Sequence, residues 1–322
     1  MDLDGDSALH NACALAIDNR ETCSILINNG ADINITNNDG QTPLHIACSH
    51  EQIEIAELLI ENGANINAAD HEGMTPFHCA TAHTREIEQL IQLLPDYEQI
   101  SCSMVPFHLA TPHEREKTIQ FLLEYGTDIN VTDHKGMTAL HHAVSFGYEN
   151  IVIFLLKYGA DLEAGDIYGR TPLYHAWKDE VVSILLEAGA NISHIDNEHM
   201  TALHYASGGI DTANVAEILI KAGADLEAVD INGRTPLFHA YNGEVTYILL
   251  KTGANISHID NKHQTALHVA SLYDLPDVVD VLIKAGANFE AVDSKGRTAL
   301  ELSIGPEVVQ ILLAAEKVVT FH

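Results

Sequence analysis

Thr42-Pro43-Leu44-His45 is the stretch that decides the fold, because variants of it return throughout the 322-residue chain. Ten such tetrapeptides follow one another at spacings of 30 to 35 residues. They are Ser7–His10, Thr42–His45, Thr75–His78, Val105–His108, Thr138–His141, Thr171–Tyr174, Thr201–His204, Thr235–Phe238, Thr265–His268 and Thr298–Glu301. A fixed period of this length indicates supersecondary units stacked in one array rather than separate domains. We therefore predict ten units in a single domain over residues 1–322.

Each unit carries the signals of two helices and a turn. Thr-Pro predicts a helix start, because the missing N–H of proline is harmless in the first turn. The second helix is illustrated by residues 53–60, whose apolar positions recur at helical spacing. Glycine then ends the helix, as at Gly63, and a polar stretch such as 69–73 predicts a hairpin. One helix pair cannot bury its apolar face alone, so neighbouring pairs must stack.

The pattern Asp-x-x-Gly-x-Thr-Pro-Leu-His, followed by Leu-Leu-x-x-Gly-Ala, resembles the ankyrin repeat over essentially the whole chain. The resemblance implies an all-α ankyrin-repeat solenoid of stacked helix-turn-helix units with β-hairpin fingers. It also implies a concave face, formed by the fingers and first helices, that binds other proteins. Catalysis is not expected of such repeats. Residues from about 1–30 and about 296–322 are interpreted as N-terminal and C-terminal caps.

The charge of the chain is strongly acidic, with 46 Asp and Glu against 16 Lys and Arg and a formal net charge of −30 with neutral histidines. This balance argues against nucleic-acid binding, because phosphate contacts need clustered Lys and Arg. It also argues against an anionic membrane surface. It favours a monomer that binds a basic or neutral protein or an extended peptide. No signal peptide or membrane insertion is predicted, so a cytoplasmic, intracellular protein is expected, with delivery into a host cell left open.

The five cysteines have no Cys-x-x-Cys spacing, so neither a zinc site nor a redox pair is indicated. They are Cys13, Cys23, Cys48, Cys79 and Cys102. We interpret them as buried free thiols in a reducing compartment.

Some units depart from the common pattern. Those beginning at Thr171 and Thr235 are three residues shorter between their helices, and the tenth unit is abbreviated in the same way. The segment 191–197 recurs unchanged at 255–261, so internal duplication is favoured over a selected binding geometry. In the third unit, residues 95–97 replace the usual Gly-Ala, which predicts irregular stacking there.

The two short units also replace the motif histidine with Tyr174 and Phe238. Trp177 and Tyr241 follow three residues later. We predict that these rings fill the gap left by the missing histidine, with ligand binding as the alternative.

Histidine is abundant, with 20 in the chain, and the resemblance assigns the seven in the motif to structural hydrogen bonds. Three others, His50, His83 and His113, share one register that Phe146 continues, and the resemblance places it at the groove end of the first helix. Stacked helices lie about 8–10 Å apart, whereas zinc needs ligand nitrogens at about 2.0–2.1 Å. No metal or cofactor is therefore predicted. A histidine ladder that contacts a peptide is favoured, and a solvated row is the alternative.

The finger tips carry a second set of candidate contacts. They are His71, His134, Tyr168, His199, Ile231 and His263. Because His199 and His263 stand where the unit normally has glycine, we predict altered turns there. Exposed aromatic and apolar groups within a charged rim are typical of protein interfaces. The preferred contacts are Phe146, Tyr168, Leu272 and Tyr273, and scattered surface residues are the alternative.

The sequence contains no phosphate-binding loop, His-Glu-x-x-His motif, nucleophile elbow or dinucleotide fingerprint. Residues 2–6 are interpreted as an acidic cap that replaces the first finger, rather than as a calcium loop. We predict a non-enzymatic protein–protein interaction scaffold or adaptor, with binding that changes between about pH 5 and 8 through its groove histidines. The alternatives are a secreted microbial or parasite effector that binds a host protein, a stoichiometric enzyme inhibitor, and a metal-dependent hydrolase.

Overall fold

A computed structural model describes residues 2–15, 19–81, 112–209 and 211–320. The fold class is confirmed, because the described residues form paired helices and no sheet. Contacts divide the chain into two compact units, residues 1–167 and residues 168–322, each described here by itself. The assignment of the whole chain to one domain stays a prediction.

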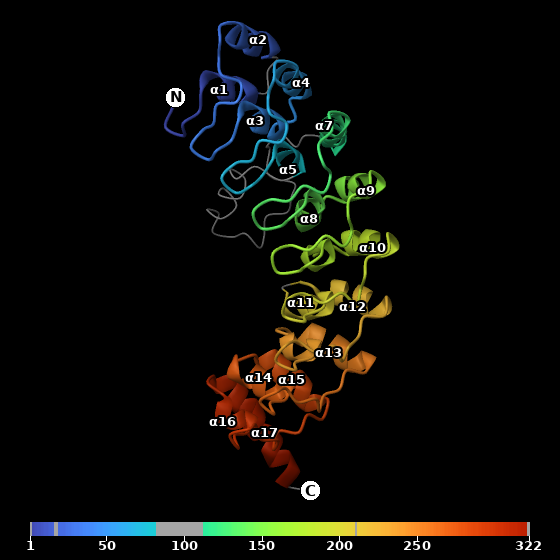
Figure 1. Cartoon of the computed structure of the whole chain (residues 1–322). Coiled ribbons are helices and arrows are strands. Elements are labelled where there is room, and N and C mark those ends of the chain that lie inside the picture. The colour runs from blue at the N-terminus through green and yellow to red at the C-terminus, as the bar shows by residue number, and fades with distance from the viewer. Residues whose placement is uncertain (1, 16–18, 82–111, 210, 321–322) are drawn as a thin grey trace. The chain divides into compact units, whose positions relative to one another are not determined.

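The helices of each unit alternate between a short first helix and a longer second helix (Figure 1). The first unit contains α1 (Ala8–Ala14), α2 (Arg20–Asn28), α3 (Pro43–Ser49), α4 (Ile53–Glu61), α5 (Pro76–Thr81), α7 (Pro112–Glu124), α8 (Ala139–Ser145) and α9 (Glu149–Lys157). The second unit contains η2 (Pro172–His175), α10 (Asp179–Glu187), α11 (Ala202–Gly208), α12 (Ala213–Lys221), η3 (Pro236–His239), α13 (Gly243–Thr252), α14 (Ala266–Leu272), α15 (Pro276–Lys284), α16 (Ala299–Leu302) and α17 (Pro306–Thr320).

Where a first helix keeps the motif histidine, this histidine begins the helix together with the motif threonine, or with Ser7 in α1. In α3, His45 Nδ1 accepts hydrogen bonds from the Thr42 N–H at 3.0 Å and its hydroxyl at 2.8 Å. In α16 the same place is taken by Glu301, whose Oε2 accepts from the Thr298 N–H at 2.8 Å. The histidine therefore performs the task of the glutamate in a capping box, which requires its neutral form.

The other ring nitrogen of the motif histidine joins one helix pair to the next. His45 Nε2 donates to the Met74 carbonyl oxygen at 3.1 Å, and His204 Nε2 donates to that of Arg234 at 3.1 Å. His10 and His268 make the equivalent bonds to Gln41 and Arg297. The prediction of structural hydrogen bonds within and between repeats is confirmed for these residues.

Within each unit the first helices pack in one row and the second helices in another (Figure 1). In the first unit the rows are α1, α3, α5, α8 and α2, α4, α7, α9. In the second unit they are η2, α11, η3, α14, α16 and α10, α12, α13, α15, α17. Leucines at the two helix faces, such as Leu44 and Leu59, are completely buried between the rows. Each such side chain contributes about 1.5–3 kcal/mol of burial, which drives neighbouring pairs to stack.

The stacking around α5 is irregular, in the repeat where the sequence predicts an irregularity. The sequence predicts two repeats between Thr75 and Thr138. The described residues there form one helix pair, α5 with α7, and α5 packs against α8. The two flanking turns are joined directly, because the His134 N–H donates to the Glu72 carbonyl oxygen at 2.9 Å. The predicted first helix at Val105–His108 lies outside the described residues.

The predicted shortening of the repeats that begin at Thr171 and Thr235 is confirmed, because their first helices are single 3-10 turns, η2 and η3. Tyr174 and Phe238 are buried, at 8% and 4% exposure. Each ring meets a histidine of the duplicated segment edge-on, His194 and His258 respectively, with centroids 5.9 Å apart in both cases. These two rings fill space in the core as predicted. The prediction was wrong for the neighbouring Trp177 and Tyr241, which are 52% and 50% exposed because the short helix ends before them.

The duplicated pair supplies a matched prediction. The Tyr174 hydroxyl lies 2.6 Å from the His194 carbonyl oxygen and 2.8 Å from that of Met200, and Phe238 has no such group. We expect Tyr174→Phe to lower the free energy of unfolding by about 1 kcal/mol, because a buried hydrogen bond is lost. Phe238→Tyr should raise it by a smaller amount. Urea unfolding monitored by circular dichroism measures both, and equal effects of the two substitutions would contradict the assignment.

Four cysteines lie in the described ranges and all are free thiols. Cys13, Cys23 and Cys48 are buried and Cys79 is partly buried, which agrees with the prediction of core thiols. Burial raises the pKa of Cys48 well above its ordinary value and raises that of Cys79 to about 12. Cys48 and Cys79 therefore stay protonated and unreactive at neutral pH. Cys102 lies outside the described residues.

Candidate protein-binding surface

Most fingers, meaning the turns between a second helix and the next first helix, are organised by one aspartate, which is buried at Asp133, Asp196, Asp230, Asp260 and Asp293. Asn37 performs this task in the finger at residues 37–41. In the finger at residues 133–137, Asp133 Oδ1 accepts hydrogen bonds from the N–H groups of Lys135 and Met137, both at 2.8 Å. The Asp133 N–H donates to the Met137 carbonyl oxygen at 3.0 Å, which closes the turn. Thr132 and Thr138 form a β-bridge beside it. The predicted β-hairpins are therefore tight turns held by a side chain, and the described residues contain no extended strand.

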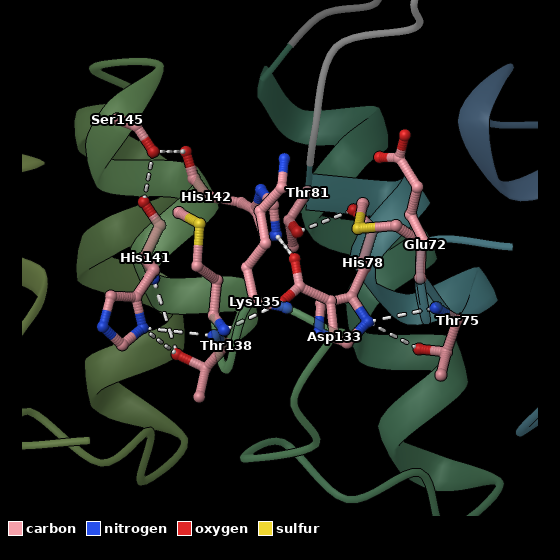
Figure 2. A network of polar contacts seen from close by, with 12 residues as sticks. Glu72, Thr75, His78, Thr81, Asp133, Lys135, Thr138, His141, His142 and Ser145 are labelled. Atoms are coloured by element: carbon pink, nitrogen blue, oxygen red, sulfur yellow. Dashed lines mark hydrogen bonds and ion pairs between the residues drawn. The ribbon is translucent and has the colours of Figure 1, made fainter. Parts of the chain in front are cut away.

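The second oxygen of this aspartate binds the residue nine positions later (Figure 2). Asp133 Oδ2 lies 3.1 Å from His142 Nε2, and Asp230 Oδ2 lies 3.1 Å from His239 Nε2. Asp196 Oδ2 accepts instead from the Tyr205 hydroxyl at 2.8 Å. Sequence reasoning missed these pairs, although the constant spacing of nine residues between aspartate and partner was a usable signal.

These contacts change the acid–base properties of the buried groups. Burial acts to raise the pKa of Asp133, but the hydrogen bonds from His142 and the Met137 N–H outweigh it and lower the pKa. The pKa of Asp230 is lowered in the same way, against burial, by the N–H groups of Arg234 and Asn232 and by His239. Burial lowers the pKa of His239 despite its aspartate partner. The fingers are thus built around carboxylates that stay ionised at neutral pH.

Two motif histidines pack against the histidines that bind the finger aspartates. His78 meets the His142 ring edge-on at a centroid distance of 5.6 Å, and His204 meets His239 in the same manner at 5.4 Å. Figure 2 shows Thr75 with His78 and Thr138 with His141 on either side of Asp133. Burial lowers the pKa of His78 and of His204 to about 4. Both are therefore neutral structural groups at physiological pH.

Two predicted finger-tip contacts of the first unit, His71 and His134, are exposed. Each ring lies over the glycine of the preceding finger. A Cβ atom placed on Gly40 would lie 2.7 Å from His71 Cδ2, and one on Gly73 would lie 2.4 Å from His134 Cδ2. Glycine at these two positions lets the next finger approach closely and present its histidine at the surface.

The prediction of altered turns at His199 and His263 was wrong. Both residues adopt the left-handed conformation of the glycine they replace, with φ of 59° and 57°. The His199 N–H donates to the Asp196 carbonyl oxygen at 3.0 Å, which matches Gly233 bonding to Asp230 at 2.9 Å. The aspartate bonds of the finger therefore outweigh the cost of about 1–2 kcal/mol of a left-handed side chain. Both histidines are exposed.

The remaining candidate contacts differ in exposure. Tyr168, Ile231 and Tyr273 are 54–56% exposed, and Leu272 is 39% exposed. The Tyr168 ring lies beside the Arg170 guanidinium, 4.7 Å from it.

The structure describes two of the four side chains in the predicted groove register, those of His50 and Phe146. His50 is exposed at the end of α3, and Phe146 is half-buried at the end of α8, where it stacks on Tyr148 with centroids 5.8 Å apart. His83 lies outside the described residues, as does the side chain of His113. The contact roles of the whole candidate set stay predictions.

A row of aliphatic side chains was missed by the sequence analysis. Each lies directly before a finger aspartate in the second unit and is 45–53% exposed. The row comprises Ile195, Val229, Ile259 and Val292. A repeated β-branched residue at one fixed place in the finger was the available signal. These residues add exposed apolar surface directly before the finger turns of the second unit.

Residues 2–6 form a finger turn of the regular kind instead of replacing it, which corrects the prediction of an acidic cap without a finger. The Asp2 N–H donates to the Asp6 carbonyl oxygen at 3.1 Å, and Asp2 Oδ1 accepts from the N–H groups of Asp4 and Asp6 at 3.1 and 2.9 Å. The acidic residues here serve turn geometry. Across the described part of the chain, no three His, Cys, Asp or Glu side chains are arranged to hold a metal ion.

The helix pairs, the capping histidines and the aspartate turns together define a helical repeat protein with its fingers exposed. The profile of ankyrin repeats matches residues 9–104, 88–166, 107–196, 165–230, 179–260, 211–293 and 241–320. The chain belongs to the ankyrin repeat family, whose domains are generally protein-binding modules and are typically non-catalytic. A comparison with curated proteins found none that matches it. Among the described helices, none has both the length and the apolar character to cross a bilayer.

Proposed function

We propose that this protein is a non-enzymatic scaffold or adaptor that binds another protein or an extended peptide through its finger tips and the ends of its first helices. The observation that carries the proposal is the recurrence of exposed aromatic and aliphatic side chains on the fingers of a helical repeat scaffold. Such groups inside an acidic surface are typical of protein interfaces, where a few aromatic anchors supply most of the binding energy.

The formal charge of −30 supports a basic partner. Opposite charge accelerates the diffusional encounter of two proteins, so the association rate should fall as salt rises. A host-protein effector and an enzyme inhibitor would use the same surface, and the identity of the partner distinguishes them.

Affinity capture tests the proposal. A triple variant, Phe146→Ala with Tyr168→Ala and Tyr273→Ala, should lose capture of the partner by about 10-fold or more, because three aromatic side chains of the proposed surface are removed. The matched control replaces three exposed residues on second helices or directly after one, Ile153, Tyr247 and Tyr158, by alanine. The control should capture as wild type does. Equal capture by both triple variants would contradict the proposed surface.

A further inference from the structure

Exposed apolar side chains stand where the first helices of the second unit end. Tyr241 follows η3, Tyr273 ends α14 and Ile304 follows α16, in three successive repeats. They are 50%, 54% and 74% exposed. The two tyrosine rings meet edge-on with centroids 6.2 Å apart, and Gly305 lies directly against Asp274, so the row continues from α14 to α16. We call these three side chains the helix-end row.

Core packing does not account for the large ring in this row. In the shortened repeat, Phe238 fills the core and Tyr241, three positions later, lies at the surface. The repeat 64 residues earlier has the same arrangement, with Tyr174 buried and Trp177 52% exposed. Both copies of the shortened repeat therefore present an exposed ring where the first helix ends. Exposed rings of this kind are the side chains that most often anchor a bound partner.

The period of the row selects the form of chain that can follow it. The helices η3, α14 and α16 pack side by side, and stacked helices lie about 8–10 Å apart. A polyproline II chain completes one turn in three residues and about 9.3 Å, so every third residue faces the next repeat. In an extended strand the residue three positions along points to the opposite side, so a strand would leave the middle repeat without a contact.

The tyrosine hydroxyls distinguish a polyproline II chain from a helix. Seven residues of an α-helix also span about 10.5 Å, but the helix uses its carbonyl oxygens for its own hydrogen bonds. A polyproline II chain has no internal hydrogen bonds, so its carbonyl oxygens accept from outside. Among the described residues, the hydroxyls of Tyr241 and Tyr273 have no hydrogen-bond partner. Rings of this kind, apolar with a polar tip, line the surfaces that bind proline-rich segments.

Acidic side chains accompany the row in each repeat. Glu244, Asp277 and Glu307 lie in the first turns of α13, α15 and α17, three or four residues after the members of the row, and all are exposed. These carboxylates stabilise the helices that they begin, and they also place negative charge beside the row. A segment with lysine or arginine next to its prolines complements this charge, whereas an acidic segment is repelled.

We propose that the helix-end row binds a basic, proline-rich segment of a partner protein in the polyproline II conformation, with one proline of every three facing each repeat. The inference rests on the proposed binding function and names the partner chemistry that one part of the surface recognises. The row provides the rings, the hydroxyl donors and the period, and the neighbouring acids provide the charge.

Fluorescence anisotropy tests the proposal with labelled synthetic peptides at about 0.15 M salt. Each peptide is about 12 residues long and repeats one tripeptide, Pro-Ala-Lys, Ala-Ala-Lys or Pro-Ala-Glu. The Pro-Ala-Lys peptide should bind about 5-fold or more tightly than the Ala-Ala-Lys peptide, and the Pro-Ala-Glu peptide should not bind. Equal or tighter binding of Ala-Ala-Lys would show that charge or a helix is recognised, and would overturn the proposal. Absence of binding by Pro-Ala-Lys would also overturn it.

Substitutions locate the binding of the Pro-Ala-Lys peptide. Tyr241→Phe with Tyr273→Phe removes only the two hydroxyls and should weaken binding by about 3-fold or more. Tyr241→Ala with Ile304→Ala should weaken it by about 5-fold or more. The matched control is Tyr247→Ala on α13, which is 55% exposed and outside the row, and should change binding by less than about 2-fold. Urea unfolding curves verify that the variants are folded. If either pair of substitutions binds like the control, the assignment of the row is wrong.

The natural partner separates this inference from the proposed function. If Tyr241→Ala with Ile304→Ala captures the partner as wild type does and the triple surface variant does not, the proline-binding row is wrong and the scaffold function stands. If the triple surface variant also captures the partner normally, the proposed binding surface itself is wrong.

Discussion

Asp230→Ala is expected to lower the free energy of unfolding by about 2–4 kcal/mol. Asp230 is 5% exposed, and its Oδ1 accepts hydrogen bonds from the N–H groups of Asn232 at 2.7 Å and Arg234 at 2.9 Å. Its Oδ2 holds His239 at 3.1 Å. Alanine would leave two backbone donors and one histidine without their shared partner, and the finger would lose the side chain that closes it.

Two comparisons make this prediction specific. Asp230→Asn keeps one oxygen for the backbone donors, so it should cost less than the alanine variant. Asp225→Ala removes an exposed aspartate that accepts one backbone hydrogen bond, from Glu227, and should cost less than about 1 kcal/mol. Urea unfolding followed by circular dichroism measures all three. If Asp230→Ala and Asp225→Ala cost the same, the buried aspartate does not organise the finger.

Acidification from pH 7 to about 4 is expected to destabilise the protein through its buried motif histidines. Burial holds the pKa of His78 and His204 at about 4, against an ordinary value of 6.5, and lowers that of His45 as well. Each of the first two shifts corresponds to at most about 3 kcal/mol. Protonation would also place a hydrogen on Nδ1, which must accept from the helix-capping threonine.

The direction of the pH effect follows from proton binding. Above about pH 6.5 neither folded nor unfolded chain protonates these histidines, so their contribution to stability is complete. Between 6.5 and 4 the unfolded chain takes up protons that the folded chain refuses, and stability falls. Below this pH window the finger aspartates also reduce stability as they become protonated. Hydrogen bonds from Arg297, for example, hold the pKa of Asp293 at about 2, against 3.8.

The measurement is the urea midpoint at several pH values between 7 and 4, on the full chain. His204→Gln provides the control, since it should be less stable at pH 7 yet lose less stability on acidification. A midpoint that stays constant from pH 7 to about 4.5 would show that the motif histidines are not kept neutral by burial. The same curves set the pH range in which any change of partner binding can be assigned to surface histidines.

Local sequence was sufficient to predict the repeat, its helices and its turns. The helix-ending glycines Gly63, Gly159, Gly223 and Gly286 all have φ between 89° and 96°, as the C-terminal glycine pattern requires. The burial of Tyr174 and Phe238 also followed from the sequence, because shortening a helix and enlarging a side chain compensate each other within one repeat. Each of these features depends on neighbours within a few residues or on strict periodicity.

The partnership of Asp133 with His142 and the pairing of α5 with α7 were decided by tertiary structure. His199 was mispredicted for a local reason instead, since hydrogen bonds to Asp196, three residues before it, hold its turn against its own backbone preference. The sequence by itself determined which residues form helices and turns, because those preferences act over one or two turns of chain. Which side chains meet across adjacent repeats depends on the distances between stacked backbones, and these distances are set only when the array packs.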